Sequence, residues 1–378
     1  MLKWIKRIAI VFCLLAVGLC GTLYYFFGGG EPYRDLTSEP ALPPGTIEAA
    51  VVSDRPIGNA TVSADGRVFY TIHPESNPVG TKLYEWVDGK PVAYPNAGDQ
   101  DRFFESPLGV VVDSKNWLWV IDPGTHGLGT VAITAFDLAT NELVHRKEFS
   151  SDIAPVGSFL QDMQVSTDGE WIYIADVGYW AKRPGIVVYN TRTQKSWRVL
   201  NRHESVYPQN ILIRSQIRDM SYFGGLLEMK TGVDGIALSR DDQWLYFAAM
   251  NHDTLYRVPT TILQQPDIDD GSIAEQLEAV GKKPLNDGLS IDDQNNVYIS
   301  DIEHQAVVRM APNGTLTTIV KDDRIRWADG LKFGPGGWLY LADSAIPHVV
   351  LQNADYHKKH APYYVWRFRP GTKGAAGQ

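Results

Sequence analysis

The chain has 378 residues, of which 44% are hydrophobic and 21% charged, so it has enough apolar mass for one large domain or two average ones. Its 34 glycines, 22 prolines and 11% aromatic residues favour short strands joined by many turns. A formal net charge of −9 without a cluster of Lys and Arg argues against a nucleic-acid surface. The motifs of phosphate loops, zinc proteases, serine hydrolases and thiol-redox sites are absent from the sequence.

Residues 1–27 have the pattern of a membrane anchor. A basic flank, 1–7, precedes residues 8–27, which carry no charge over about the length that a helix needs to cross a bilayer. The flank should stay in the cytoplasm, so we expect a single-pass protein of the inner membrane with its remainder on the periplasmic or extracellular side. Secretion after cleavage of a signal peptide is the alternative. Both cysteines, Cys13 and Cys20, lie in this segment, so the exported part has no disulfide.

Residues 28–45 are rich in glycine and proline and are predicted to form a linker. The remainder, 46–378, contains an internal repeat of one hairpin, in which an apolar strand, a polar turn and an aromatic-rich strand follow one another. The six copies are "PIGNATVSADGRVFYTI" from Pro56, "PLGVVVDSKNWLWVID" from Pro107, "QDMQVSTDGEWIYIAD" from Gln161, "VDGIALSRDDQWLYFAA" from Val233, "NDGLSIDDQNNVYISD" from Asn286 and "ADGLKFGPGGWLYLAD" from Ala328.

Further strand pairs lie between the copies, which gives four strands to each of six units and predicts an all-β, six-bladed β-propeller after one transmembrane helix. The segment Thr46–Val52 has no partner in its neighbourhood and is predicted to pair with Tyr363–Phe368, closing the ring and burying both terminal edges. A two-domain sandwich is the structural alternative, but it gives no reason for six copies of one hairpin.

Residues 272–281 interrupt the strand pattern. Ser272 and Glu275 form a capping box and Gly281 is a stop signal, which predicts a short amphipathic helix on the rim. The acidic stretch 267–271 resembles the start of a calcium loop, but its glycine comes one position early, so it is interpreted as a solvated turn.

The repeat also predicts two rings of carboxylates at one mouth of the channel, because the start of the first strand and the end of the second strand of each blade share one face. Two carboxylates about 5 Å apart repel by roughly 3 kcal/mol at an effective dielectric near 20, so a cation, a shared proton or N–H donors must offset them. The first strands contribute Asp162, Asp234, Asp287 and Asp329, and the second strands contribute Asp122, Asp176, Asp301 and Asp343.

We expect the second ring to be structural, because Asp residues of this kind cap turns and tie neighbouring blades together. Asp234 and Asp287 lie on the channel itself, where a functional role is favoured. Four histidines follow second strands in loops of this same face, where one could act as a general base near a cation, although such histidines are more often only solvated. They are His126, His252, His304 and His348.

From Leu108 to about Leu263 the sequence resembles the yellow/major royal jelly protein family, through "LWVIDPG" at 118–124, "IYIADV" at 172–177, "GIVVYNTRTQKSWRVL" at 185–200, "DGIALSRDDQWLYFAAM" at 234–250 and "LYRVPTTIL" at 255–263. The resemblance implies a secreted six-bladed propeller. In some members it implies binding of amines or other small ligands at the channel mouth, or dopachrome conversion. The lack of disulfides is similar to a bacterial branch of that family.

The Asp-Gly blade starts are also similar to those of gluconolactonase-like enzymes, which implies Ca²⁺ or another divalent cation at the channel entrance. Asp234 and Asp287 match two ligand positions of that group. Its third ligand, a Glu in the first blade, is replaced here by Ile57-Gly58-Asn59, where only Asn59 offers a polar side chain.

The first functional hypothesis is therefore an enzyme, a divalent-cation-dependent lactone or ester hydrolase. Asp234, Asp287 and Asn59 would hold the cation, which would polarise the carbonyl group. Asp234 or Asp287 would orient water, and Arg218 or His304 would meet developing charge.

The alternative hypothesis is a binding protein of the yellow/royal jelly type, which holds an amine or aromatic molecule without converting it. Its walls would be Tyr179, Trp180 and Tyr222, and its other candidate contacts are Asp162, Asp329 and His252. A dopachrome-type tautomerase is a third hypothesis. In every case the partners are a small molecule and, through the N-terminal helix, a membrane, and not a nucleic acid.

Overall fold

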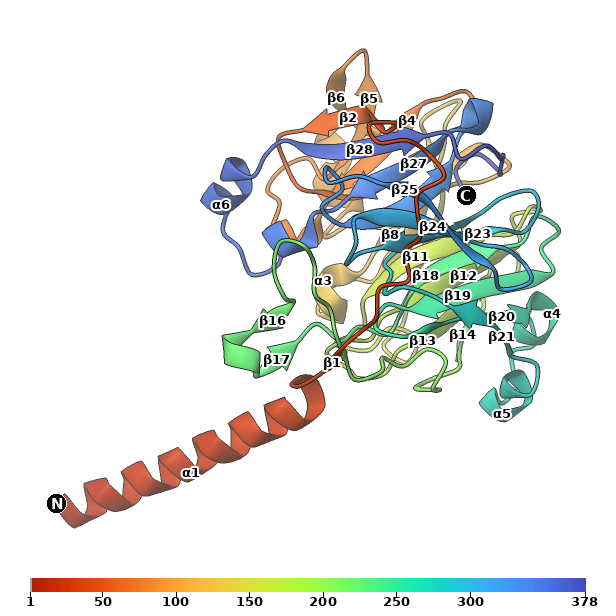
Figure 1. Cartoon of the computed structure of the whole chain (residues 1–378). Helices are drawn as coiled ribbons and strands as arrows, with labels where there is room; N and C mark the ends of the chain where they lie inside the picture. Colours follow the sequence, from red (N-terminus) through yellow and green to blue (C-terminus); the bar gives the residue numbers. More distant parts are fainter. Residues whose placement is uncertain (1) are drawn as a thin grey trace.

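A computed structural model describes residues 2–378 and contains a six-bladed β-propeller preceded by a long helix, α1 (Leu2–Phe27) (Figure 1). Each blade is an antiparallel sheet of four strands whose order runs from the channel outward. The first three blades are β3 (Ile57–Val62), β4 (Val68–Ile72), β5 (Leu83–Val87) and β6 (Lys90–Ala93); β7 (Val110–Val112), β8 (Trp117–Asp122), β9 (Ala132–Asp137) and β10 (Leu143–Glu148); and β11 (Leu160–Val165), β12 (Trp171–Asp176), β13 (Gly185–Asn190) and β14 (Ser196–Val199).

The other three blades follow the same order, and the last takes its outermost strand from the N-terminal side of the chain. They are β18 (Val233–Leu238), β19 (Trp244–Ala249), β20 (Thr254–Pro259) and β21 (Glu278–Lys282); β22 (Leu289–Ile291), β23 (Val297–Asp301), β24 (Ala306–Met310) and β25 (Leu316–Lys321); and β26 (Ala328–Phe333), β27 (Leu339–Asp343), β28 (Tyr363–Phe368) and β2 (Glu48–Ser53).

Short elements occupy the loops. The strands are β1 (Glu31–Pro32), which pairs in parallel with β15 (Ile211–Leu212), and the hairpin of β16 (Ser221–Tyr222) and β17 (Leu227–Glu228). The helices are α2 (Gln100–Phe103), α3 (Gly124–Gly127), α4 (Thr260–Leu263), α5 (Asp270–Ala274) and α6 (Ala354–Lys359), with 3₁₀ turns at Pro74–Ser76, Ala97–Asp99, Phe223–Gly225, Pro335–Gly337 and Ile346–His348.

The ring closes as the sequence predicts. β2 pairs antiparallel with β28, with Val51 opposite Val365 and Ser53 opposite Tyr363. The sixth blade therefore joins the two sides of the chain, with β2 as its outermost strand and β28 covered on both sides. Apolar side chains from adjacent blades fill the space between the sheets, as Trp119 of the second blade and Ile172 of the third do in one shared cluster.

The predicted rim helix is only partly correct. α5 covers Asp270–Ala274, and its cap is Asp269, whose side chain accepts a hydrogen bond from the Ser272 backbone N–H. Residues 278–282, which the capping-box interpretation continued as helix, form the outer strand β21. The exposed edge of β20 explains the difference, because pairing Thr254 with Lys282 satisfies backbone groups that a helix would leave open.

The linker is not a free tether. Its strand β1 pairs with β15, and the backbone N–H groups of Ala41 and Leu42 donate to the carbonyls of Thr318 and Ile319 on β25. Residues 28–45 therefore follow the propeller surface before the chain enters β2 (Figure 1).

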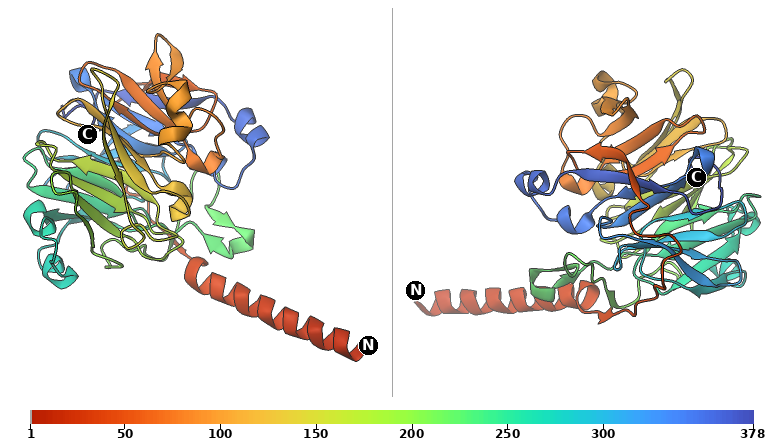
Figure 2. Two further views of the ribbon diagram at one scale, coloured as in Figure 1. Left: turned by 180° about the vertical axis from the view of Figure 1, so that it is seen from behind. Right: turned by 45° about the horizontal axis from the view of Figure 1, so that its top comes forward.

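α1 has the length and composition of a membrane span. Residues Lys3–Phe27 form 25 helical residues, the most apolar 18-residue window of which has a mean hydropathy of 2.2, and none of that window is buried by the propeller. The helix leaves the propeller on the side that carries α3, α6 and the β16–β17 hairpin, as both Figure 1 and Figure 2 show. At the other end of the channel, residues 371–378 fold back across several blades. The Gly377 carbonyl accepts from Thr61 and Val112, and that of Gln378 from Ser290.

Candidate functional site

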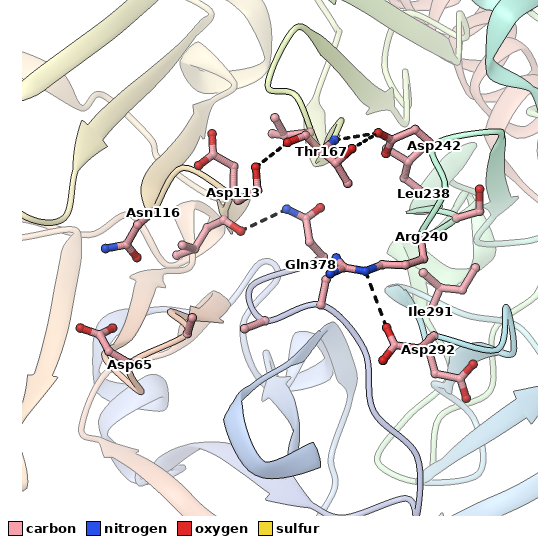
Figure 3. A pocket seen from close by; sticks show the side chains of 18 residues that line it. Asp65, Asp113, Asn116, Thr167, Leu238, Arg240, Asp242, Ile291, Asp292 and Gln378 are labelled. Carbon is pink, nitrogen blue, oxygen red and sulfur yellow. Dashed lines mark hydrogen bonds and ion pairs between the residues drawn. The ribbon is translucent and has the colours of Figure 1, made fainter.

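Two cavities lie at opposite ends of the channel. The first, of about 430 Å³, is lined by turns between first and second strands and by residues near Gln378 (Figure 3). Several of its polar groups bond to one another. Asp242 accepts from the Thr167 backbone N–H at 2.9 Å, and Gln378 donates to the Val112 carbonyl at 3.1 Å. The second, of about 370 Å³, opens at the end where first strands begin, and it contains Asp234 and Asp287. We call it the acidic cavity.

The four first-strand aspartates converge as the repeat predicts. Each is at most 3% exposed, and the charges of Asp162, Asp287 and Asp329 all act on Asp234. Three of the four lie at register shifts, between residues 160 and 163, 233 and 235, and 328 and 331. Such β-bulges re-aim side chains, which is how residues on separate blades come to face one centre.

The glycine that follows three of these aspartates has a packing reason. A Cβ at Gly235 would collide with the backbone carbonyl of Asp287, and a Cβ at Gly288 would collide with that of Asp329. At these positions the inner strand approaches its neighbour too closely for a side chain. The repeated Asp-Gly pair is a geometric requirement of packing the inner strands around the channel, and the same packing brings the carboxyl groups together.

Asp234 and Asp287 form a pair that is connected by N–H donors. The Gln161 amide donates to Asp234 Oδ2 at 3.0 Å and to Asp287 Oδ1 at 3.3 Å. The Trp327 indole N–H donates to Asp287 Oδ2 at 2.6 Å, while Asp234 Oδ1 is buried without a partner. We call Asp234 and Asp287 the carboxyl pair.

Burial controls the protonation of the ring. Burial and then the charge of Asp287 raise the pKa of Asp234 well above its usual range, and burial raises the pKa of Asp287 to about 7 although Trp327 opposes this shift. The pKa of Asp329 is raised for the same reason. Burial thus favours the protonated form of Asp234, and Asp287 changes charge near neutrality.

The other two members of the ring are partly neutralised below the cavity. Asn59 donates to Asp162 at 3.0 Å, and the charge of Lys332 opposes the rise that burial causes in the pKa of Asp162. Asn59, Asp162 and Lys332 are each at most 3% exposed, so buried polar side chains fill the channel between the two cavities. Among the described residues, no Lys or Arg forms an ion pair with the carboxyl pair.

The walls of the acidic cavity are apolar and aromatic. The rings of Tyr179 and Trp180 lie 4.8 Å apart and nearly perpendicular, and the Tyr179 hydroxyl donates to the Glu228 carbonyl at 2.8 Å. The buried Tyr222 hydroxyl has no partner. Other apolar side chains of the lining are Phe159, Phe223, Met229, Met250, Ile346 and Leu351.

A second polar group lies on the cavity wall. The His126 ring is stacked on Phe159 at 4.4 Å, and its Nε2 lies 2.7 Å from a Glu75 carboxylate oxygen. His73 accepts from the Glu75 backbone N–H, and burial lowers the pKa of His73 to about 4, so His73 is neutral. The sequence interpretation included His126 among loop histidines but missed His73 and Glu75, which belong to the first blade.

Six of the predicted site residues do not line the cavity. Asn59, Asp162 and Asp329 are buried outside its lining, and the other three are held by local contacts. Arg218 lies behind its wall, where it donates to the Val350 carbonyl at 3.1 Å and stacks 5.1 Å from the Tyr222 ring centre. His252 accepts from the Thr254 backbone N–H, and burial lowers its pKa to about 4. His304 is bound to Asp301, whose hydrogen bond raises the pKa of His304.

Three members of the second ring hold strand ends in place. Asp176 accepts from the Phe159 backbone N–H and from Arg198 at 2.7 Å, and both side chains of that ion pair are almost fully buried. Asp343 accepts from the backbone N–H groups of Arg326 and Trp327, and Asp122 from that of Ser106. These bonds fix the end of a second strand to the loop that leads into its own blade and not to a neighbouring blade. Asp301 accepts instead from the backbone N–H groups of Glu303 and His304 in the loop that follows its strand.

The predicted cation site of Asn59, Asp234 and Asp287 is not assembled. Asn59 turns to Asp162, and its Oδ1 accepts from the Ala60 backbone N–H, so it offers nothing to the carboxyl pair. N–H donors occupy both oxygens of Asp287. Within residues 2–378 the one cluster with three suitably close ligand atoms is Asp35, Asp301 and His304, away from the acidic cavity. This donor set does not fit a cation at the carboxyl pair.

Comparison with known proteins agrees with this geometry. The sequence profile described as major royal jelly protein matches residues 105–369, more than half of the chain. Protein yellow of Drosophila subobscura is 29% identical over 201 residues, 47% of this chain and 34% of the relative. Protein yellow of Drosophila melanogaster is 27% identical over 194 residues, 46% and 34% of the two chains. The chain thus matches about a third of the length of these relatives.

Solved structures share the fold. A luciferin-regenerating enzyme has a TM-score of 0.57 at 12% identity, covering 88% of this chain and 97% of its own. A gluconolactonase from Xanthomonas campestris has 0.52 at 13%, covering 85% and 88%. The calcium-binding protein regucalcin from Agrobacterium tumefaciens has 0.53 at 15%, covering 89% and 98%. At such low identity the likeness concerns the fold alone.

Proposed function

The chain belongs to the major royal jelly protein family, and on that premise we propose that it is a membrane-anchored protein that binds a small aromatic molecule with a basic nitrogen in the acidic cavity. α1 would be an uncleaved anchor, with the propeller on the periplasmic or extracellular side. The observation that carries the proposal is the carboxyl pair, which lies buried beneath aromatic walls with no cationic partner of its own.

A protonated amine would supply the positive charge that the carboxyl pair lacks and an N–H donor for its unpartnered oxygen. Its N–H groups would meet Asp287 and the unpartnered Oδ1 of Asp234, and its charge would offset that of Asp287. The aromatic part would lie against Tyr179, Trp180 and Tyr222, where ring stacking and apolar burial favour it. The volume of about 370 Å³ is within the usual range of small-molecule sites.

The test compares two ligands that differ only in the amine, tyramine and 4-ethylphenol, by calorimetry on the full chain in detergent. Tyramine should bind more tightly, and Asp287→Asn should weaken it about tenfold or more, because a hydrogen bond to a charged group is worth about 1.5–3 kcal/mol. The exposed Asp293→Asn, at the other end of the channel, is the matched control. Equal binding of the two ligands would contradict the proposal.

A catalytic role is the second candidate, and the protonation of the carboxyl pair favours it. Burial favours the protonated form of Asp234 beside Asp287, whose pKa is about 7, so the pair could accept one proton and return another near neutral pH. A tautomerase needs that exchange, and so does a hydrolase that activates water. Hydrolysis of lactones and isomerisation of catechol-derived quinones should be assayed with and without Ca²⁺. Activity that requires Ca²⁺ and disappears in Asp287→Asn would favour the cation-dependent hydrolase.

A further inference from the structure

The end of α1 is attached to the mouth of the acidic cavity. Phe27, the last residue of the helix, is 9% exposed, and its ring centre lies 5.4 Å from Tyr179 and 5.7 Å from Trp180. The Lys182 ammonium lies 3.9 Å from the Phe27 ring centre. The helix thus ends on two residues of the cavity wall, with no slack segment between them.

Residues directly after the helix keep it there. The buried Lys230 ammonium donates to the Gly28 carbonyl at 2.5 Å and to Asn210 at 2.6 Å, and β1 then pairs with β15. Since about 30 Å of hydrocarbon accommodates most of a 25-residue helix, the C-terminal end of α1 lies at the bilayer surface. The mouth of the acidic cavity lies at that same level.

The exposed apolar side chains beyond α1 gather on this face. Every large hydrophobic residue of the described chain after α1 that is at least half exposed lies in a loop at the cavity end of the propeller. They are Val79 at 89%, Leu128 at 72%, Val156 at 65%, Trp180 at 50%, Phe223 at 72% and Leu351 at 63%. We call these six residues the apolar rim. Three of them, Trp180, Phe223 and Leu351, also line the cavity.

We propose that the apolar rim docks on the surface of the bilayer that holds α1, so that the acidic cavity opens into the membrane interface. The inference rests on the anchoring and the ligand class of the proposed function. Tyr and Trp favour the headgroup level, and here Tyr24 and Tyr25 lie within one helical turn of Phe27, whose ring packs on Tyr179 and Trp180. The ligand is accordingly an amphiphilic aromatic amine that partitions into the membrane and enters the cavity from it.

The experiment places a fluorophore on the full chain in nanodiscs and measures quenching by lipids that carry a spin label near the headgroup. Cys13→Ser and Cys20→Ser remove the native thiols, and the label is attached at Phe223→Cys, Leu351→Cys or, on the opposite end of the propeller, Asp65→Cys. Quenching at the two rim sites should exceed that at the Asp65 site by about threefold or more, because docked apolar faces lie about 5–10 Å into the interface. Equal quenching at all three sites would overturn the proposal.

A rim variant separates docking from binding. Leu128→Ser with Val156→Ser changes two rim residues that do not line the cavity, and Val92→Ser on the outer strand β6 is the matched control. The double variant should reduce quenching at Phe223→Cys about twofold or more while tyramine binding in detergent stays within about twofold of the unmodified chain. Unchanged quenching in the double variant would overturn docking through the rim. If the unmodified chain does not bind tyramine in detergent, the proposed function is refuted, whatever the quenching shows.

Discussion

Asp287→Asn should change how stability depends on pH. Burial raises the pKa of Asp287 to about 7 from the usual value near 3.8, so the folded chain binds a proton that the unfolded chain releases between these values. That contribution to stability is fully present below about pH 4 and is lost as pH rises through about 7. The shift of about 3 pH units corresponds to at most about 4 kcal/mol. The amide keeps the shape but cannot ionise, so the substituted chain avoids this loss.

The measurement is urea unfolding of the full chain in detergent, followed by tryptophan fluorescence at intervals from pH 4.5 to 8.5. The free energy of unfolding of Asp287→Asn minus that of the unmodified chain should rise with pH, most steeply between about 5 and 7.5. Near pH 4.5 the substitution costs about 1 kcal/mol when the new side-chain NH₂ group faces the NH₂ group of Gln161, because two donors then meet. Rotation of the Gln161 side-chain amide by 180° removes this cost. Asp293→Asn, exposed at the other end of the channel, should give a flat difference. A flat difference for Asp287→Asn as well would refute the assigned protonation.

Two other substitutions test the contacts around the site. Trp327→Phe removes the indole N–H that donates to Asp287. Tyramine binding needs the ionised carboxylate and therefore rises with pH, so the pH midpoint of binding should move upward by about one unit in calorimetric titrations. An unchanged midpoint would mean that this hydrogen bond does not control the charge of Asp287. Arg198→Met leaves Asp176 as an unpaired buried carboxylate and should lower the free energy of unfolding by about 3–5 kcal/mol, whereas the exposed Arg192→Met should cost less than about 1 kcal/mol. Similar losses in these two variants would show that the second ring does not stabilise the blades.

The fold was predictable from the repeat, because the repeat determines where strands and turns lie. Alternating apolar strands with a turn every few residues fix the hairpins, and six of them in sequence need a closed ring to cover their edges. The same register predicted that Asp162, Asp234, Asp287 and Asp329 meet, since a shared position in equivalent strands is a shared position around the channel. The outer strand β21 was missed because residues 272–281 carry a local helix signal that the pairing demand of β20 overrides.

The partners of the carboxyl pair were harder to predict. Gln161 stands one residue before Asp162 and Trp327 two before Asp329, so a comparison of the positions just ahead of these aspartates could have drawn attention to both. Which side chain turns toward the centre depends on β-bulges, which the sequence pattern does not mark. Arg218 and His304 were placed near the pair because they lie in loops of the correct face. A face is much wider than a cavity, and local bonds hold each of them elsewhere.

Ligand entry and exit depend on three buried side chains, those of Asn59, Asp162 and Lys332. Because they lie buried between the two cavities, a guest that arrives through the mouth of the acidic cavity would have to depart by the same route. A propeller seated on lipid, as proposed, would return its cargo to the layer it came from. Under the proposed binding role, such a protein would store or present a molecule and would not conduct it across.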